Sequence, residues 1–251
     1  MKKLFILLVL FLICTSSSYS EEISVFNKSI SELPIHITLP EKIKANIIAI
    51  VGGKGINNAM GKSNNYLTRN KNNFVNSDIA FYLFPNFKKS DTASYKFRAS
   101  SHQVKRIKLL VEYIKTQNKH PIFILGFSRG SVDTAAYAKK FPDSLKGIII
   151  ISGVYKNQTK KAKLFSMEKI IGKSINVKTL IVHHEKDACK VTQFKYAFKF
   201  FKSLKGQKEL FKYTDGKGTG RVCGPYHHHG YEGIEDKVSN DISVWIINNS
   251  N

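Results

Sequence analysis

Cysteines are scarce in this sequence of 251 residues, and their number and spacing argue against the common zinc-binding proteins. The three cysteines form no C-x-x-C pair, and no H-E-x-x-H motif occurs, so the common zinc-binding patterns are missing. Histidines do cluster at residues 183–184 and 227–229, but adjacent residues of a strand point to opposite faces and cannot all bind one ion. We therefore expect neither a metal site nor a cofactor.

Long hydrophobic runs are equally scarce. The run at residues 4–13 is far shorter than the roughly 20 residues that cross a bilayer, and no later run is long enough either. Two lysines precede it and a small, polar stretch follows it, which is the order of segments in a secretory signal peptide. We expect residues 1–20 to be this leader and the protein to be secreted or periplasmic. Cys14 leaves open a lipoprotein leader, against which the bulky Ile13 argues.

Acidic residues are few enough to leave the chain strongly basic, with 40 Lys and Arg against 18 Asp and Glu and a formal net charge of +22. Such a field attracts anionic polymers, anionic lipids and acidic substrates. The lysines are nevertheless scattered over every predicted helix, and neither a nucleic-acid-binding motif nor an interleaved basic and aromatic surface is present. We expect no specific nucleic-acid partner and only a weak attraction to anionic surfaces.

Apolar runs alternate with helical patterns over the rest of the chain. We expect strands at residues 23–30, 33–40, 44–51, 78–84, 122–128, 147–152, 178–184 and 209–215. We expect helices at residues 64–75, 100–117, 131–141, 193–204 and 236–249. Most strands after the first two are continuously apolar, which indicates a mostly parallel α/β sheet with helices on both faces, after an antiparallel start. The length suits one domain, residues 21–251, with a small or absent lid.

A serine stands between two glycines at the end of one apolar run. The stretch PIFILGFSRGS places Ser128 between a strand and the helix predicted from residue 131, and residues 126–130 fit the motif G-x-S-x-G. In that motif a sharp turn exposes a nucleophilic serine, and small neighbours let the strand and helix pass closely. The strand-turn-helix context favours this interpretation over a chance match, and it makes Ser128 a candidate nucleophile.

A serine hydroxyl is a weak nucleophile at neutral pH, so it needs a base that is oriented by a carboxylate. Asp187 follows a predicted strand, and a histidine of residues 227–229 precedes the last predicted helix. The resulting order of serine, acid and histidine is a known order of a catalytic triad. Two other acids compete: Glu185 lies close to the end of its strand, whereas Asp215 follows a later strand and is the alternative acid.

Three segments of the chain together resemble members of one superfamily. GFSRGSVDTAAYA, LIVHHEKDACKVT and HGYEGIEDKVSNDISVWI are similar, in this order, to segments of secreted or periplasmic α/β hydrolases. The resemblance implies the α/β-hydrolase fold, with Ser128 as nucleophile, Asp187 as acid and His229 as base. It implies no substrate, because the lid is reduced and no histidine precedes the glycines at residues 52–53.

The loop after the strand at residues 44–51 carries Gly52 and Gly53 and is the candidate oxyanion segment. Backbone N–H groups of such a loop, and of the residue after the nucleophile, form an oxyanion hole. We therefore predict Gly53, Lys54 and Arg129 as the donors, with a simple turn as the alternative. A phosphate-binding loop is excluded, because the lysine is not followed by serine or threonine.

Together these residues predict a serine hydrolase that cleaves a small carboxylic ester or thioester through an acyl-enzyme. An amide or peptide substrate stays an open alternative, although nothing identifiable apart from His229 would protonate an amine leaving group. The alternative function is a non-catalytic module that binds an anionic polymer or membrane on the same scaffold. A complete set of serine, acid and histidine in the right order favours the enzyme.

Two cysteines remain once the leader with Cys14 is removed, an even number that suits disulfide formation in an exported protein. Cys189 lies two residues after Asp187, and Cys223 lies six residues before His229. If the acid and the base meet, their loops are neighbours, and we expect a disulfide between Cys189 and Cys223 that joins them. The alternative is a pair of free, buried thiols.

Overall fold

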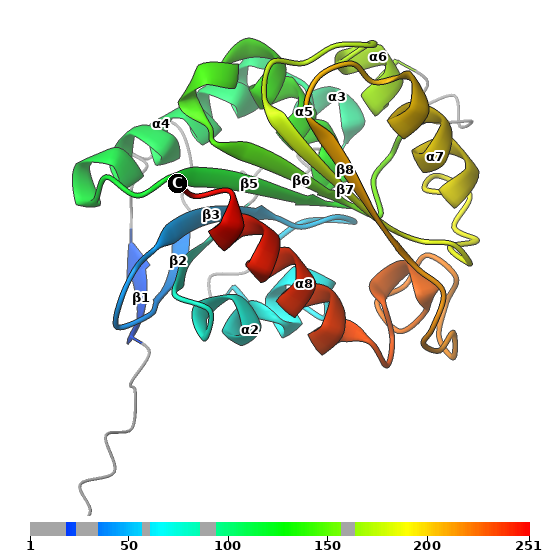
Figure 1. Ribbon diagram of the computed structural model, residues 1–251, viewed down its shortest axis with the longest axis horizontal. Coiled ribbons are helices and arrows are strands. Elements are labelled where there is room, and N and C mark those ends of the chain that lie inside the picture. The colour runs from blue at the N-terminus through cyan, green and yellow to red at the C-terminus, as the bar shows by residue number, and fades with distance from the viewer. Residues whose placement is uncertain (1–18, 24–34, 57–60, 86–93, 157–163) are drawn as a thin grey trace, which may run out of the picture.

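One sheet of eight strands organises the fold (Figure 1). The computed structural model describes residues 19–23, 35–56, 61–85, 94–156 and 164–251. The strands lie in the order β1-β2-β4-β3-β5-β6-β7-β8. Their bounds, from β1 to β8, are Tyr19–Ile23, Ile35–Leu39, Ala45–Ile50, Ile79–Leu83, Ile122–Phe127, Gly147–Ile151, Lys178–His184 and Lys208–Tyr213. β1 and β2 form antiparallel pairs, whereas β3 to β8 run parallel to one another, as the continuously apolar runs predict.

Helices cover both faces of this sheet (Figure 1). Their bounds, from α1 to α8, are Tyr66–Arg69, Lys71–Val75, Tyr95–Arg98, Ser101–Gln117, Gly130–Lys140, Met167–Ile170, Phe194–Ser203 and Glu235–Asn248. On one face α4, α5 and α7 pack into a core that includes Ile48 and Ile50 of β3. On the other face α1, α2 and α8 pack into a second core that includes Ile47 and Ala49. Alternate residues of one strand are thus buried on opposite faces, and the predicted fold class is confirmed.

The antiparallel start of the sheet lies earlier than predicted. Its first strand is β1, which pairs with β2, whereas the strand predicted at residues 23–30 falls outside the described residues apart from its first position. β1 also includes the last two residues of the predicted leader. Residues 1–18 lie outside the described part of the chain, so the leader stays a prediction. Within the described ranges, no helix combines the length and apolar character needed to cross a membrane.

The helix predicted at residues 64–75 is instead two short helices, α1 and α2, which are separated by Asn70. Asn70 has φ −106° and ψ 14°, and its side-chain amide donates to the Tyr66 carbonyl oxygen at 2.8 Å. This side chain competes with the backbone for that carbonyl and so favours the break. The sequence does not predict α3 and α6 either, because each has only four residues and one turn shows no periodicity.

Three backbone segments converge where β5 leads into α5, and glycines permit the approach. A Cβ atom at Gly130 would lie 2.1 Å from the carbonyl oxygen of Ile50, and one at Gly126 would lie 2.4 Å from Thr134 Oγ1. No side chain tolerates such distances, so packing requires both glycines of the G-x-S-x-G motif. α5 therefore rests directly on the backbone of β3, beside the candidate nucleophile.

We expect Gly130→Ala to lower the free energy of unfolding by about 3 kcal/mol, because the added methyl group forces α5 away from β3. Gly172→Ala is the control: Gly172 has φ +74°, but no atom lies within 4 Å of its Cβ position. Backbone strain alone should then cost about 1 kcal/mol. Urea denaturation of both variants measures the difference, and equal losses would contradict the importance of the close approach.

Candidate active site

Ser128 occupies the turn between β5 and α5 in a strained backbone conformation. Its φ is 52°, in the left-handed region that residues other than glycine rarely adopt. The turn is held from both sides: the Ser128 N–H donates to the Ile151 carbonyl at 2.9 Å, and the Ser131 hydroxyl donates to the Ser128 carbonyl at 2.7 Å. Ser128 is thereby fixed at the C-terminal edge of the parallel strands, where ligands bind in sheets of this kind.

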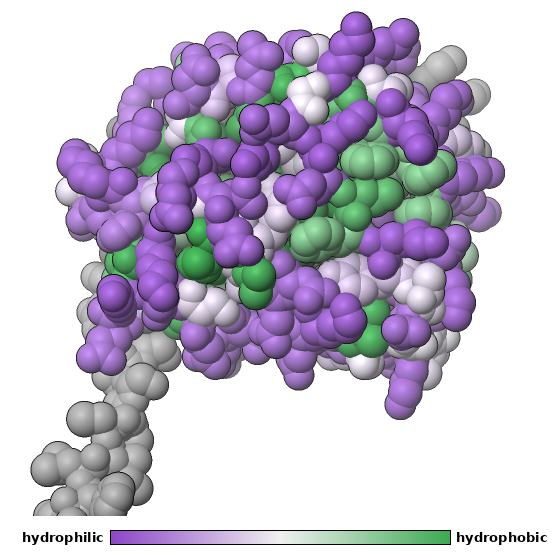
Figure 2. Space-filling model, in the orientation of Figure 1, coloured by the Kyte–Doolittle hydropathy of each residue, from purple (hydrophilic) through white to green (hydrophobic). Residues whose placement is uncertain are grey.

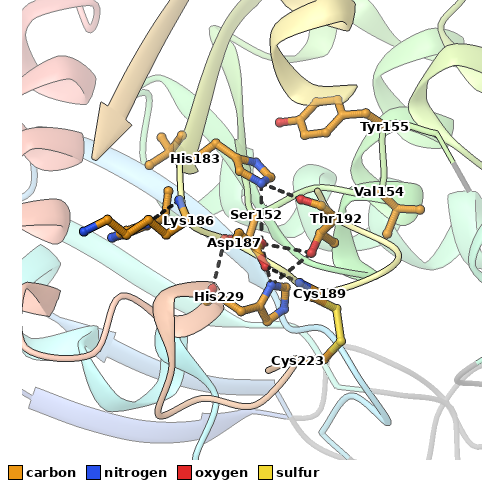
Figure 3. A network of polar contacts seen from close by, with 12 residues as sticks. Ser152, Val154, Tyr155, His183, Lys186, Asp187, Cys189, Thr192, Cys223 and His229 are labelled. Carbon is orange, nitrogen blue, oxygen red and sulfur yellow. Dashed lines mark hydrogen bonds and ion pairs between the residues drawn. A yellow bond between two sulfur atoms is a disulfide. The ribbon is translucent and has the colours of Figure 1, made fainter. Parts of the chain in front are cut away.

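Asp187 and His229 are in direct contact (Figure 3). Asp187 lies in the loop after β7, and His229 lies in the short turn His228–Gly230 before α8. The distance between His229 Nδ1 and Asp187 Oδ2 is 2.9 Å, and both residues are buried. The competing acids Glu185 and Asp215 are both exposed. Of the three acids considered, the structure brings Asp187 to this histidine.

The imidazole of His229 also lies beside the turn that carries Ser128. Its ring centroid is 5.2 Å from that of Phe127, the residue before Ser128. Among the hydrogen bonds of the described residues, none joins Ser128 Oγ to His229, and such bonds are often longer when no substrate is bound. Because Nδ1 faces Asp187, Nε2 is the ring nitrogen that remains for the serine proton.

The Asp187 carboxylate is held by more than His229. The Cys189 N–H donates to Oδ1 and the Thr192 hydroxyl donates to Oδ2, both at 2.9 Å. His183 Nε2 lies 3.4 Å from Oδ2. Burial by itself would raise the pKa of Asp187, but the imidazoles of His229 and His183 more than offset it and hold the pKa well below its usual range. The carboxylate is therefore ionised at neutral pH.

Three residues without a predicted role support this pair, namely Thr192, His183 and Ser152. The Thr192 hydroxyl lies 3.1 Å from His229 Nδ1 as well as contacting Asp187. The Ser152 hydroxyl donates to the His229 carbonyl oxygen at 2.9 Å, from a residue with φ 46°. Thr192 and His183 stand within five residues of Asp187, and this proximity in sequence could have identified them as candidates. No neighbouring motif in the sequence points to Ser152.

A disulfide joins Cys189 and Cys223, as the sequence predicts (Figure 3). Cys189 stands two residues after Asp187, and Cys223 stands in the loop that leads to His229. The bond spans a sequence separation of 34 residues and connects the acid loop directly to the histidine loop. Asp187 and His229 are thus held together by a covalent link as well as by hydrogen bonds.

The predicted oxyanion loop lies against Ser128. A Cβ atom at Gly52 would be 2.6 Å from Ser128 Cβ and 3.2 Å from Ser128 Oγ, so the position requires glycine. The loop turns at Gly53, whose φ is 56°, and both Gly53 and Lys54 are exposed. Arg129 follows Ser128 directly in the chain. The three predicted donors therefore belong to two segments that meet at the serine.

Three further histidines gather beside the site. The ring centroid of His228 lies 4.5 Å from that of His184 and 4.9 Å from that of His227. His184 Nε2 lies 2.5 Å from the Asp215 carbonyl oxygen, and His184 Nδ1 accepts from the Lys186 N–H at 3.0 Å. These contacts select the neutral imidazole, because a proton on Nδ1 would face another donor. In the part of the chain that the structure describes, no three His, Cys, Asp or Glu residues are arranged to hold a metal ion.

We expect the free energy of unfolding to fall as the pH is lowered below about 6.5, the ordinary pKa of histidine. Burial, and then neighbouring positive charges, lower the pKa of His184 and of His228. The unfolded chain therefore binds protons first, so this stability is complete above about pH 6.5 and is lost as the pH falls through the lower folded-state values. Denaturant unfolding at about pH 7.5 and about pH 5.5 measures the effect.

Two variants test the source of this pH dependence. His228→Gln should reduce the difference in unfolding free energy between the two pH values, because it removes one group with a lowered pKa. His120→Gln replaces an exposed histidine and should leave the difference as it is in the wild type. An unchanged difference in His228→Gln would contradict the assignment to this cluster.

The chain resembles known proteins in its fold, whereas its sequence matches no family model and no curated protein significantly. An α/β serine hydrolase without a lid from Xanthomonas campestris is similar in structure, with 12% identity, a TM-score of 0.58 and 94% of each chain covered. A dienelactone hydrolase from Anabaena variabilis has 14% identity and a TM-score of 0.63, covering 93% of this chain and 98% of its own. A monoacylglycerol lipase from Paleococcus ferrophilus has 14% identity and a TM-score of 0.64, covering 87% of this chain and 100% of its own.

Proposed function

We propose that this chain, whose fold is that of the α/β hydrolases, is a serine hydrolase that cleaves a small carboxylic ester or thioester. The observation that carries the proposal is the contact between the ionised Asp187 and His229 at the sheet edge that also carries Ser128. In this proposal Ser128 is the nucleophile, His229 is the base, and Asp187 orients the base.

The reaction proceeds in two halves. His229 takes the Ser128 proton on Nε2 while Oγ attacks the carbonyl carbon of the substrate. Asp187 keeps its charge, orients the Nδ1–H group and stabilises the imidazolium that forms. His229 then gives the proton to the leaving alcohol or thiol, and the acyl group stays on the serine. In the second half the same histidine activates a water molecule, which releases the acid and restores the serine.

Backbone N–H groups stabilise the developing oxyanion in this proposal. Arg129 stands at the N-terminal end of α5, a helix of 11 residues whose dipole favours negative charge there. Gly53 and Lys54 belong to the loop that approaches Ser128 through Gly52. Donors that are already in place cost no rearrangement when the charge forms, and they make a large contribution to acyl transfer.

Leaving-group chemistry and the paired side chains favour an esterase over the other candidates. An alcohol or thiol is a better leaving group than an amine and depends less on the proton from His229, which favours an ester or thioester and leaves an amide as the alternative. A non-catalytic binding module would need neither an ionised Asp187 nor a histidine hydrogen-bonded to it. With the predicted leader, the enzyme would meet its substrate outside the cytoplasm, either after secretion or in the periplasm.

We expect Ser128→Ala, His229→Ala and Asp187→Asn each to lower kcat for short p-nitrophenyl esters by at least about 10³, because the three residues act as a unit. Combining Ser128→Ala with His229→Ala should lower kcat little further. A fluorophosphonate probe should label the wild type and not Ser128→Ala. Ser203→Ala, at an exposed serine of α7, is the control and should behave as the wild type. Normal turnover in Ser128→Ala would show that Ser128 is not the nucleophile.

The basic surface generates a separate prediction about acidic substrates. Hydrophilic residues cover most of the face that Figure 2 shows, and the formal net charge of the chain is +22. Close to Ser128, the half-buried Arg129 places its guanidinium 5.0 Å from the centre of the Tyr95 ring. We expect kcat/KM for an anionic ester to fall as the ionic strength rises, because salt screens the attraction. The kcat/KM of a neutral ester should change little, and an equal salt dependence of both would contradict steering.

A further inference from the structure

Four buried polar side chains form a network behind the oxyanion loop: Arg98, Gln103, Arg106 and Asp133, none of them more than 2% exposed. Arg98 Nη1 donates to Asp133 Oδ2 at 2.5 Å, and Gln103 Nε2 donates to Asp133 Oδ1 at 2.6 Å. Arg106 Nη1 donates to Gln103 Oε1 at 2.7 Å. Removing these groups from water is costly, and the contacts between them offset that cost.

Arg98 is the member of this network that contacts the oxyanion loop. It is the last residue of α3, and its Nη2 donates to the Gly53 carbonyl oxygen at 3.5 Å, a long hydrogen bond. Its other partner, Asp133, lies in the first turn of α5, the helix that follows Ser128. One guanidinium therefore bridges the two segments that carry the predicted oxyanion donors.

We propose that Arg98 is a positioning residue of the oxyanion hole, which holds the Gly53 peptide in a fixed orientation relative to α5. The inference rests on the proposed function, because an oxyanion forms there only if Ser128 is the nucleophile. The guanidinium of Arg98 touches neither the serine nor the substrate in this role, and it acts through the backbone of the loop.

Peptide geometry explains what the contact with Gly53 does. In a trans peptide the carbonyl and the following N–H point in opposite directions, so a Gly53 carbonyl held toward Arg98 fixes the direction of the Lys54 N–H. Packing leaves space beside this peptide, because no atom lies within 4 Å of the Gly53 Cβ position, and the turn hydrogen bond from the Gly55 N–H to the Gly52 carbonyl at 2.8 Å closes around the peptide without contacting it. Glycine also adopts many backbone conformations. Without Arg98, the Lys54 donor would lose its preferred direction.

Charged groups form this network: Arg98 contacts the Asp133 carboxylate directly, and Arg106 contacts it through Gln103. Burial lowers the pKa of Arg106 to about 10, so its guanidinium is still protonated at neutral pH. Burial also raises the pKa of Asp133, and the charge of Arg98 opposes that rise. An N–H group that points at the oxyanion stabilises the negative transition state more than a neutral bound ester, so the loss of Arg98 should affect kcat more than KM.

The first experiment separates this role from support of the fold. Arg98→Met alone would leave Asp133 buried without its ionic partner, so it is combined with Asp133→Leu, which removes both charges of the pair. For this double variant we expect kcat with a neutral p-nitrophenyl ester to fall about 10-fold to 100-fold, with KM within about threefold of the wild type. Inhibition by a trifluoromethyl ketone, which forms a tetrahedral adduct with serine, should weaken by the same factor as kcat/KM.

Arg98→Lys and Arg106→Lys are a matched pair of single variants. Arg106 is as deeply buried in the same network, but its Nη2 donates to the Pro85 carbonyl oxygen at 3.0 Å and not to the oxyanion loop. A lysine ammonium lacks the planar fork with which Arg98 bridges Asp133 and Gly53. We expect kcat to fall about tenfold in Arg98→Lys and to stay within about threefold in Arg106→Lys, measured well below the Tm of both.

Two results would overturn the inference. Equal losses of kcat in the two lysine variants would show that the network supports only the fold, and a normal kcat in the folded double variant would show that the Gly53 peptide is held without Arg98. The proposed function fails in a different way. In that case the wild type itself would neither react with a fluorophosphonate at Ser128 nor hydrolyse esters, and the role of Arg98 would fall with it.

Discussion

The packing of three backbones without intervening side chains is the constraint on which the site depends. α5 meets the backbone of β3 at Gly130, and the loop after β3 meets the serine at Gly52. The turn between β5 and α5 is thereby forced to present Ser128 with φ 52°, between a helix N-terminus and a glycine loop. Asp187 and His229 are carried to the same edge by the loops after β7 and β8. A change at the glycines would therefore move the serine relative to every other part of the site.

Two buried carboxylates have different roles in the proposed chemistry. Asp187 accepts hydrogen bonds from a backbone N–H, from Thr192 and from His229, and it orients the group that moves the proton. Asp133 accepts from Arg98 and Gln103, and through Arg98 it is connected to the loop proposed to bind the oxyanion. Burying a charge costs free energy unless the charge is paired and hydrogen-bonded, which explains why both carboxylates have several donors.

The sequence predicts those parts of the structure that local patterns encode. Most of the parallel strands are continuous apolar runs, although β8 at the sheet edge is not, and Ser128 and the disulfide cysteines stand in recognisable segments. Arg98 belongs to a one-turn helix without periodicity, and its partner Asp133 is 35 residues away, so local spacing cannot distinguish it from a solvated arginine. Ser152 contacts the His229 backbone across 77 residues. Such partners depend on how the sheet brings distant loops together, which is why single-sequence patterns miss them.

The disulfide makes the rigidity of the site depend on the compartment that surrounds the protein. Thiols stay reduced in the cytosol and are oxidised after export, so the bond between Cys189 and Cys223 forms only in the second setting. In an exported chain, only noncovalent contacts would join the acid and histidine loops during synthesis. The disulfide would be added after export. Under reducing conditions, the acid and the base would therefore be aligned less firmly than in the oxidised protein.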